Sequence, residues 1–171
     1  MPPHVLALAP ASVRLVTDAD SLDFLHCDAV HVAAPLSVFQ AYCAMTSEIP
    51  GWLAAAFRAR DFISRWFNVV DIHGFSPRSP NQVPAVGELL DFFVVEALSD
   101  NQMVLTSRDA HLAVMVCMDL TPVRESVLRL SVTTSVQHFN TFGRLYMVPV
   151  GPAHGPIVKR MLRNAVVAFP I

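Results

Sequence analysis

Charged residues and glycine are both scarce in this chain of 171 residues. Charged side chains make up 15% of it, against about 25% in an average globular protein. Its 6 glycines form no GxGxxG or Walker pattern, which excludes the phosphate loops of nucleotide-dependent enzymes. Because 14 acidic residues outnumber 12 basic ones, the chain also lacks the basic surface on which nucleic-acid binding depends. We expect neither nucleotide chemistry nor a nucleic-acid partner.

Cysteine is limited to Cys27, Cys43 and Cys117. Three scattered cysteines do not form a disulfide framework, and without a CxxC pair they do not indicate zinc binding or thiol redox chemistry. HxH and HExxH patterns are missing too, so a metal site would need His138 or His154 to arrive through folding. We expect buried thiols, no metal and no cofactor.

Targeting signals are weak. Residues 1–12 are small and apolar but hold no lysine or arginine, so they do not match a signal peptide. The longest stretch without an acid or base, residues 29–47, changes periodicity at Pro35 and predicts a strand and a helix rather than a membrane span. We expect a cytoplasmic protein with one domain over residues 1–171, of which residues 1–20 are loosely ordered.

Hydrophobic residues make up 53% of the chain, and their spacing predicts its elements. Residues 26–33 are rich in valine and alanine and predict a first strand. Ala34-Pro35 predicts the start of a helix. A second helix is expected over Trp52–Phe67, and the proline-rich residues 74–84 are typical of an irregular surface loop.

Four strands are predicted in the second half, over residues 91–98, 103–108, 111–120 and 127–138. The turn residues at 99–102 indicate a hairpin between the first two. Residues 127–138 alternate between apolar and polar side chains, which predicts an antiparallel strand with one face in water. Residues 111–120 are apolar on both faces, so we expect that strand to be covered on both sides.

The end of the chain has the strongest helical pattern. Apolar residues recur on one face after Pro156, a natural first-turn residue. The order of strand, two helices, several antiparallel strands and a terminal helix predicts an α+β fold with the helices on one face of the sheet. The apolar face of the terminal helix consists of Ile157, Val158, Met161, Leu162, Ala165 and Val166.

This order of elements, together with residues 31–39 and Ile49-Pro50-Gly51-Trp52, resembles the START-like (SRPBCC, helix-grip) superfamily. That superfamily includes lipid-transfer, plant-allergen and polyketide-cyclase branches. The resemblance implies a curved antiparallel sheet wrapped around a long C-terminal helix, with two short helices after the first strand. It also implies a cavity between the sheet and that helix.

The second half is similar to the bacterial family called domain of unknown function 2867. Four segments carry the similarity: residues 108–112, 133–134, 138–147 and 152–154. The most specific is the His-x-Asn-x-x-Gly-Arg-x-Tyr run within residues 138–147. By order of elements the resemblance extends over residues 29–166.

Two positions depart from the family pattern. Where such sequences tend to have Asp-x-His-Leu-Asp-Phe, this chain has Ala113 and Val114. Where an aromatic and a basic residue tend to flank the late histidine, it has Ala153 and Gly155. The family has no established activity, so the resemblance implies a fold and a cavity rather than a reaction.

Asp109 and His111 are the first candidate site residues. Because they lie two apart at the start of a strand, their side chains project to the same face and could share a proton or orient a polar ligand group. The alternative is a strand-entry turn in which Asp109 accepts backbone N–H groups.

A second polar group occupies the otherwise apolar C-terminal third. Arg144 offers a fixed fork for a carboxylate or phosphate, while histidine and tyrosine offer adjustable hydrogen bonds. The alternative is structural, with a helix cap, a close backbone contact at Gly143, and an ion pair between Arg144 and Asp109. The group comprises His138, Asn140, Arg144, Tyr146 and His154.

Aromatic and methionine side chains are numerous enough to line an apolar pocket that adapts to a flexible ligand. The same residues would also fill an ordinary core. They are Phe57, Phe62, Trp66, Phe67, Phe92, Phe93, Phe142, Met115, Met118, Met147 and Met161.

Three functions remain open from the sequence. The leading hypothesis is a protein that binds a small apolar or amphipathic molecule, whose polar end meets His138, Asn140, Arg144 or His154. The second is a cyclase- or hydrolase-like enzyme in which Asp109 with His111 or His138 acts as an acid–base pair. The third is a non-catalytic homo-oligomer, such as a homodimer, whose interface takes up the surplus apolar surface.

Overall fold

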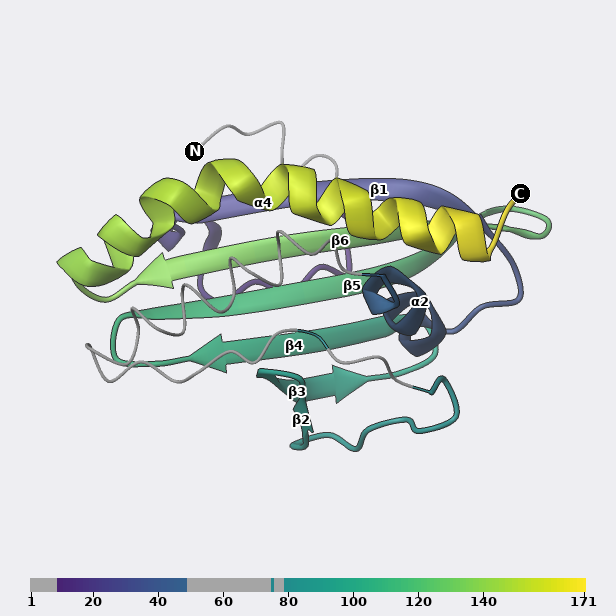
Figure 1. Cartoon of the computed structure of the whole chain (residues 1–171), viewed down its shortest axis with the longest axis horizontal. Coiled ribbons are helices and arrows are strands. Elements are labelled where there is room, and N and C mark those ends of the chain that lie inside the picture. The colour runs from purple at the N-terminus through teal and green to yellow at the C-terminus, as the bar shows by residue number, and fades with distance from the viewer. Residues whose placement is uncertain (1–8, 49–74, 76–78) are drawn as a thin grey trace.

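A computed structural model describes residues 9–48, 75 and 79–171 of the chain. It has an α+β architecture in which an open antiparallel sheet carries a long C-terminal helix on one face (Figure 1). In chain order the described elements are η1 (Ala19–Ser21), β1 (Phe24–Ala33), α2 (Val38–Thr46), β2 (Leu89–Leu90), β3 (Phe93–Leu98), β4 (Gln102–Arg108), β5 (Leu112–Arg124), β6 (Val127–His138) and α4 (Thr141–Ala168).

The sheet has six strands in the order β1-β6-β5-β4-β3-β2. All neighbouring pairs are antiparallel. Strands β2 to β6 form a meander, and β1, the first strand of the chain, pairs with β6 at the edge of the sheet. The strands predicted from period-two alternation are confirmed, as is the hairpin at residues 99–102, which joins β3 and β4. Side chains at even positions of β1, β5 and β6 share the face that α4 covers.

Helix α4 is much longer than the sequence pattern predicts. It begins at Thr141, and Pro156 lies inside it rather than in its first turn. The helix runs along the sheet beside β1, as Figure 1 shows. Its predicted apolar face is confirmed in the C-terminal half, where Val158, Leu162 and Ala165 are buried.

Helix α2 follows β1 as predicted, but Pro35 precedes it. The N-cap is Ser37, whose hydroxyl accepts the Gln40 backbone N–H, while the Gln40 side chain accepts the Ser37 N–H. This capping box satisfies two backbone donors at the start of the helix. The helix is tied to α4 by Asn164, whose Nδ2 donates to the carbonyl oxygens of Met45 and Glu48. The second predicted helix, residues 52–67, lies outside the described residues.

The main core lies between the sheet and the two helices. Val32, Leu105 and Leu130 from the strands pack with Phe39 from α2 and Leu162 from α4. The region before β2 is irregular over residues 79–88, in agreement with the predicted loop.

The opposite face of the sheet is covered by residues 12–16. The Val16 backbone N–H donates to Ser135 Oγ at 2.9 Å, and Ser12 Oγ donates to Asp119 Oδ1 at 2.9 Å. The prediction of a wet face on residues 127–138 is therefore wrong: Ser131, Thr133 and Ser135 are at most 1% exposed. Their small polar side chains match the alternation of a solvated strand, but the preceding segment of the chain folds over them.

Strand β5 is covered on both faces, as predicted. Met118 and Leu120 belong to the core under the helices. Ala113, Met115 and Cys117 form a smaller cluster with Val16 on the other face. Both apolar faces of this strand are thus covered within one chain.

Candidate functional site

A cavity of about 230 Å³ lies between the inner face of the sheet and α4. Every strand from β1 to β6 except β2 contributes to its walls, together with α2 and the N-terminal three quarters of α4. Most of its lining is apolar. The residues are Phe24, Tyr42, Met45, Phe75, Phe92, Phe93, Leu105, Ser107, Asp109, His111, Leu112, Val114, Val116, Met118, Val132, Thr134, Val136, Phe142, Tyr146, Met147, Val150, His154, Ile157, Val158 and Met161.

The β4–β5 turn carries the first polar group of the cavity. Asp109 Oδ1 accepts the backbone N–H groups of His111 at 2.7 Å and Leu112 at 3.0 Å. This is the strand-entry turn considered above as an alternative. The same turn leaves both Asp109 and His111 on the cavity wall, so a structural role and contact with a ligand are compatible.

Asn140 joins this turn to the start of α4. As the N-cap, its Oδ1 accepts the Gly143 N–H at 3.1 Å. Its Nδ2 donates to the Ala110 carbonyl oxygen at 3.1 Å and lies 2.9 Å from His111 Nδ1. Asn140 itself is exposed and does not line the cavity. Its link to the cavity wall is the contact with His111.

Gly143 allows this close approach of α4 to the β4–β5 turn. A Cβ atom at this position would collide with the His111 carbonyl oxygen. The Phe139 N–H donates to the same carbonyl at 2.8 Å, and the Phe142 ring lies against the His111 ring with centroids 4.6 Å apart. The first turn of α4 is therefore set by backbone contact as well as by its cap.

No lysine or arginine from the described residues lines the cavity. The polar lining that the described residues contribute consists of hydroxyl groups, two histidines and one carboxylate. Within this part of the chain, an anionic ligand group would meet no cation and would approach the Asp109 carboxylate. The polar lining residues are Tyr42, Ser107, Asp109, His111, Thr134, Tyr146 and His154.

His154 lies on α4 against β1. It is well beyond the first turn of the helix, which contacts His111. Its ring meets those of Phe24 and His26 edge to face, with centroids 5.5 and 5.2 Å away. Burial and, to a smaller extent, the nearby His26 together lower the pKa of His154 to about 4. Its Nε2 atom is buried and has no hydrogen-bond partner in the described part of the chain. His154 is thus neutral at physiological pH.

His26 and Asp28 extend this polar group along β1, beneath α4. Burial lowers the pKa of His26, with Asp28 acting in the opposite direction and Lys159 in the same one. His26 Nδ1 and Asp28 Oδ2 are also buried without a hydrogen-bond partner from the described residues. Unpaired buried polar atoms cost free energy and are rare in folded proteins.

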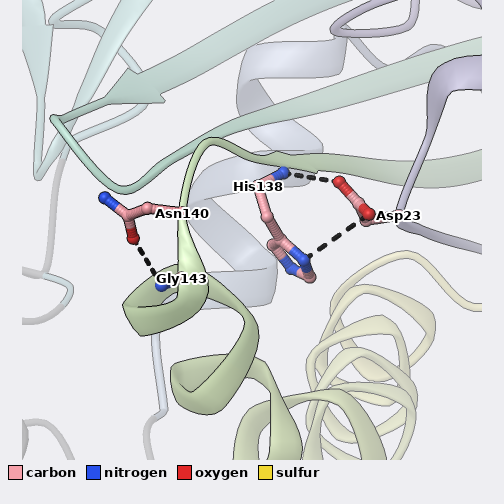
Figure 2. A network of polar contacts seen from close by, with 4 residues as sticks. All are labelled: Asp23, His138, Asn140 and Gly143. Carbon is pink, nitrogen blue, oxygen red and sulfur yellow. Dashed lines mark hydrogen bonds and ion pairs between the residues drawn. The ribbon is translucent and has the colours of Figure 1, made fainter.

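Two further predicted site residues, besides Asn140, do not line the cavity. The His138 backbone N–H donates to Asp23 Oδ2 at 2.6 Å, and its ring Nδ1 lies 3.7 Å from Asp23 Oδ1, as Figure 2 shows. Arg144 is exposed on α4. The cavity wall includes neither residue, because His138 ends its strand beyond the cavity and Arg144 faces solvent.

Comparison with known proteins identifies the family. The sequence profile described as "Protein of unknown function (DUF2867)" matches residues 18–161. The chain belongs to the DUF2867 family. No curated protein matches the sequence.

Two solved structures are similar to this DUF2867 chain. Hypothetical protein jhp0584 from Helicobacter pylori has a TM-score of 0.47 and 13% identity, over 94% of this chain and 99% of the other. The Mll3558 protein from Rhizobium loti has a TM-score of 0.36 and 16% identity, over 85% of this chain and 96% of the other.

The structure gives local roles to the His-x-Asn-x-x-Gly-Arg-x-Tyr run of this DUF2867 chain. It spans the last residue of β6 and the start of α4. Asn140 caps the helix, Gly143 permits the backbone contact and Tyr146 lines the cavity. Asn140 and Gly143 therefore make the contacts of the structural alternative, a helix cap and a close backbone contact.

The predicted aromatic and methionine lining is correct for Phe92, Phe93, Phe142, Met118, Met147 and Met161. Met115 faces the other side of the sheet, because it is one residue out of phase with the inner positions of β5. Phe57, Phe62, Trp66 and Phe67 lie outside the described residues.

Sequence reasoning missed several polar lining residues. Ser107 and Thr134 occupy inner positions of β4 and β6, where the alternation alone could have placed them. His26 and its contact with His154 had no such signal, because 128 residues separate the two histidines and only the β1–α4 packing brings them together.

Among residues 9–48, 75 and 79–171, no three His, Cys, Asp or Glu side chains are grouped so as to hold a metal ion. Within the same residues no helix has the length and apolar character needed to cross a membrane.

Proposed function

We propose that this protein binds a small apolar or amphipathic molecule between its sheet and α4. The observation that carries the proposal is the cavity of about 230 Å³ with its largely apolar lining. A close-packed protein interior leaves few voids larger than a water molecule. The START-like helix-grip arrangement, in which a curved sheet holds a ligand against a terminal helix, is part of this proposal.

The volume of the cavity limits the size of the ligand. A dry, apolar protein cavity of roughly 150 Å³ binds benzene. The present cavity is larger than that, so a single ring with a short substituent, or a short branched chain, matches it. The aromatic walls of Phe24, Phe92 and Phe93 suit a flat or flexible hydrocarbon body.

The polar lining indicates that the ligand is uncharged. Among the four residues expected to meet its polar end, only His154 lines the cavity. The Arg144 guanidinium, which would pair with a carboxylate or phosphate, is exposed outside it. A neutral group that reaches one of the histidines or hydroxyls would gain a hydrogen bond without the cost of burying an ion.

Native mass spectrometry of the purified protein, followed by denaturing extraction, tests for a retained molecule. Titration with α-methylstyrene, a single ring with a short substituent, tests the cavity directly. We expect saturable binding of one molecule per chain. Val116→Phe should abolish it, because Val116 lies on the inner wall.

The matched control is Val94→Phe, at a position that is 39% exposed on β3 and outside the cavity. It should bind α-methylstyrene like the parent protein. The absence of both a retained molecule and saturable probe binding would contradict the proposed function, as would equal binding by Val116→Phe.

One observation favours a second candidate function, acid–base catalysis in the same cavity. Asp109 and His111 both lie on its wall, whereas the alternative partner His138 does not. Release of phenol from phenyl acetate, faster than in buffer and lost in Asp109→Asn and His111→Phe, would support catalysis. Rates equal to the buffer rate would contradict catalysis, and only the binding function would remain.

A further inference from the structure

The Asn140 side chain has a fixed orientation at the start of α4. Its Oδ1 accepts the Gly143 N–H at 3.1 Å, and its Nδ2 donates to the Ala110 carbonyl oxygen at 3.1 Å. An amide rotated by half a turn would place its NH₂ group against an N–H donor and its oxygen against a carbonyl. Both contacts therefore identify the same atom as nitrogen.

This orientation determines which tautomer of His111 is favoured. Asn140 Nδ2 lies 2.9 Å from His111 Nδ1, closer than Asn140 Oδ1 at 3.3 Å. Since Nδ2 is a donor, His111 Nδ1 serves as the acceptor. In a neutral imidazole the single proton then resides on the other nitrogen, Nε2.

The Nε2 side of His111 is available to a ligand. The ring lines the cavity, with Nδ1 close to Asn140 and the ring tilted against that of Phe142. Nε2 makes no hydrogen bond to the described residues. His111 therefore offers an Nε2–H donor among the residues that line the cavity, which also include Ser107 and Tyr146.

We propose that Asn140 is a positioning residue that holds His111 with its proton on Nε2, so that the cavity selects ligands with a neutral oxygen acceptor, such as a ketone, ester or alcohol. Anionic oxygens are disfavoured, because no cation from the described residues lines the cavity and Asp109 lies two residues from His111. This inference rests on the proposed function and names its ligand class.

Asn140→Asp tests the role of the amide. Aspartate is as good an N-cap as asparagine, so Gly143 keeps its acceptor. A carboxylate, however, accepts from Nδ1–H instead of donating to Nδ1, which moves the proton of neutral His111 from Nε2 to Nδ1. Proton–nitrogen correlation NMR of the histidine rings at about pH 9, where a free imidazole is neutral, reports the tautomer without any ligand.

Acetophenone and α-methylstyrene provide the ligand test, since they differ only in a carbonyl oxygen against a methylene group. We expect Asn140→Asp to weaken acetophenone binding about fivefold relative to α-methylstyrene, the usual worth of one neutral hydrogen bond. His111→Phe should produce the same relative loss. Using the ratio of the two affinities cancels their different solubilities in water, as well as any general effect of the variant on the cavity.

Asn140→Ser separates capping from positioning. Serine caps a helix as well as asparagine, but its shorter side chain does not reach His111. We expect this variant to retain the thermal stability of Asn140→Asp within a few degrees and to lose part of the acetophenone preference.

The outcomes are distinguishable. If neither probe binds the parent protein, the proposed function fails. If both bind, but Asn140→Asp leaves the proton on Nε2 or leaves the affinity ratio unchanged, the positioning role of Asn140 fails while the binding function stands. Tighter binding of benzoate than of acetophenone would overturn the neutral ligand class.

Discussion

At the scale of single residues, the wall of the cavity contains a buried polar group that lowers the stability of the protein. His154 contributes an unpaired, buried Nε2 atom next to the rings of Phe24 and His26. A phenylalanine would fill nearly the same space without that unsatisfied atom, and the ring contacts would remain. Sites of function often carry residues that cost stability in this way.

His154 makes the stability of the protein depend on pH. Its pKa is lowered to about 4 in the folded state by burial and by His26. As the pH falls below about 6.5, the unfolded chain takes up a proton that the folded chain does not. The free energy of unfolding should fall by up to about 3 kcal/mol between about pH 6.5 and pH 4, and His26 acts in the same direction.

His154→Phe should lose less stability over that pH interval and should be at least as stable as the parent protein at neutral pH. Urea unfolding at a series of pH values measures both effects. His31→Asn, which replaces an exposed histidine of β1, is the control and should follow the parent curve. Parallel curves for the parent protein and His154→Phe would show that His154 does not carry the effect.

At the scale of elements, the position of α4 depends on the contact between its first turn and the β4–β5 turn. Gly143→Ala places a methyl group against the His111 carbonyl oxygen and should lower the free energy of unfolding by about 1–3 kcal/mol. Urea unfolding measures the loss. In addition, movement of the helix should weaken probe binding, because Phe142 and Tyr146 line the cavity from this first turn and the next.

Gly151→Ala is the matched control on the same helix. A Cβ atom there would meet the Phe24 ring at an ordinary van der Waals distance of 3.7 Å. Alanine is the better helix former, so this variant should gain about 0.5–1 kcal/mol. Equal losses from the two substitutions would mean that the contact with the His111 carbonyl oxygen does not determine the effect.

The segment that covers the outer face of the sheet depends on Asp119. Its Oδ1 accepts hydrogen bonds from Ser12 Oγ at 2.9 Å and Gln102 Nε2 at 2.8 Å, and Cys117 Sγ lies 3.4 Å from Oδ2. Asp119→Ala should destabilise the protein by about 2–3 kcal/mol, the value of hydrogen bonds to a charged group. It should also release residues 12–16 from the sheet.

Release of that segment would expose Cys117, whose pKa is raised to about 12 by burial. Its reaction with iodoacetamide should be very slow in the parent protein and faster in Asp119→Ala, with peptide mass mapping to locate the modified cysteine. Asp100→Ala, in an exposed turn, is the control. Unchanged labelling of Cys117 in Asp119→Ala would mean that the segment is held by other contacts.

At the scale of the whole molecule, the cavity joins the sheet, α2 and α4, so a ligand that occupies it stabilises all three. At about a hundred times its dissociation constant, α-methylstyrene should add about 2.7 kcal/mol. For a chain of this length the melting temperature would rise by roughly 5–10 °C. Differential scanning calorimetry with increasing probe concentration measures the rise.

In Val116→Phe, the added ring should remove the response to α-methylstyrene, while Val94→Phe should retain it. A rise of equal size in both variants would place the probe elsewhere on the protein. This comparison tests the cavity as a unit, whereas the Asn140 variants test one wall of it.

The sequence by itself determined strands β1 and β3 to β6, the hairpin at residues 99–102, the apolar face of the C-terminal half of α4 and the family, because these depend on local periodicity, turn chemistry and short motifs. It also indicated which polar residues were candidates. Asp109, His111, Tyr146 and His154 lie on the cavity wall.

Only the tertiary structure decided how those candidates are used. It separated His138 and Arg144 from the cavity, buried the apparently wet face of β6 under residues 12–16, and brought His26 to His154. Each result depends on contacts between segments far apart in the chain. Local sequence patterns carry no information about such contacts, because they record which face of an element is apolar but not which other element covers it.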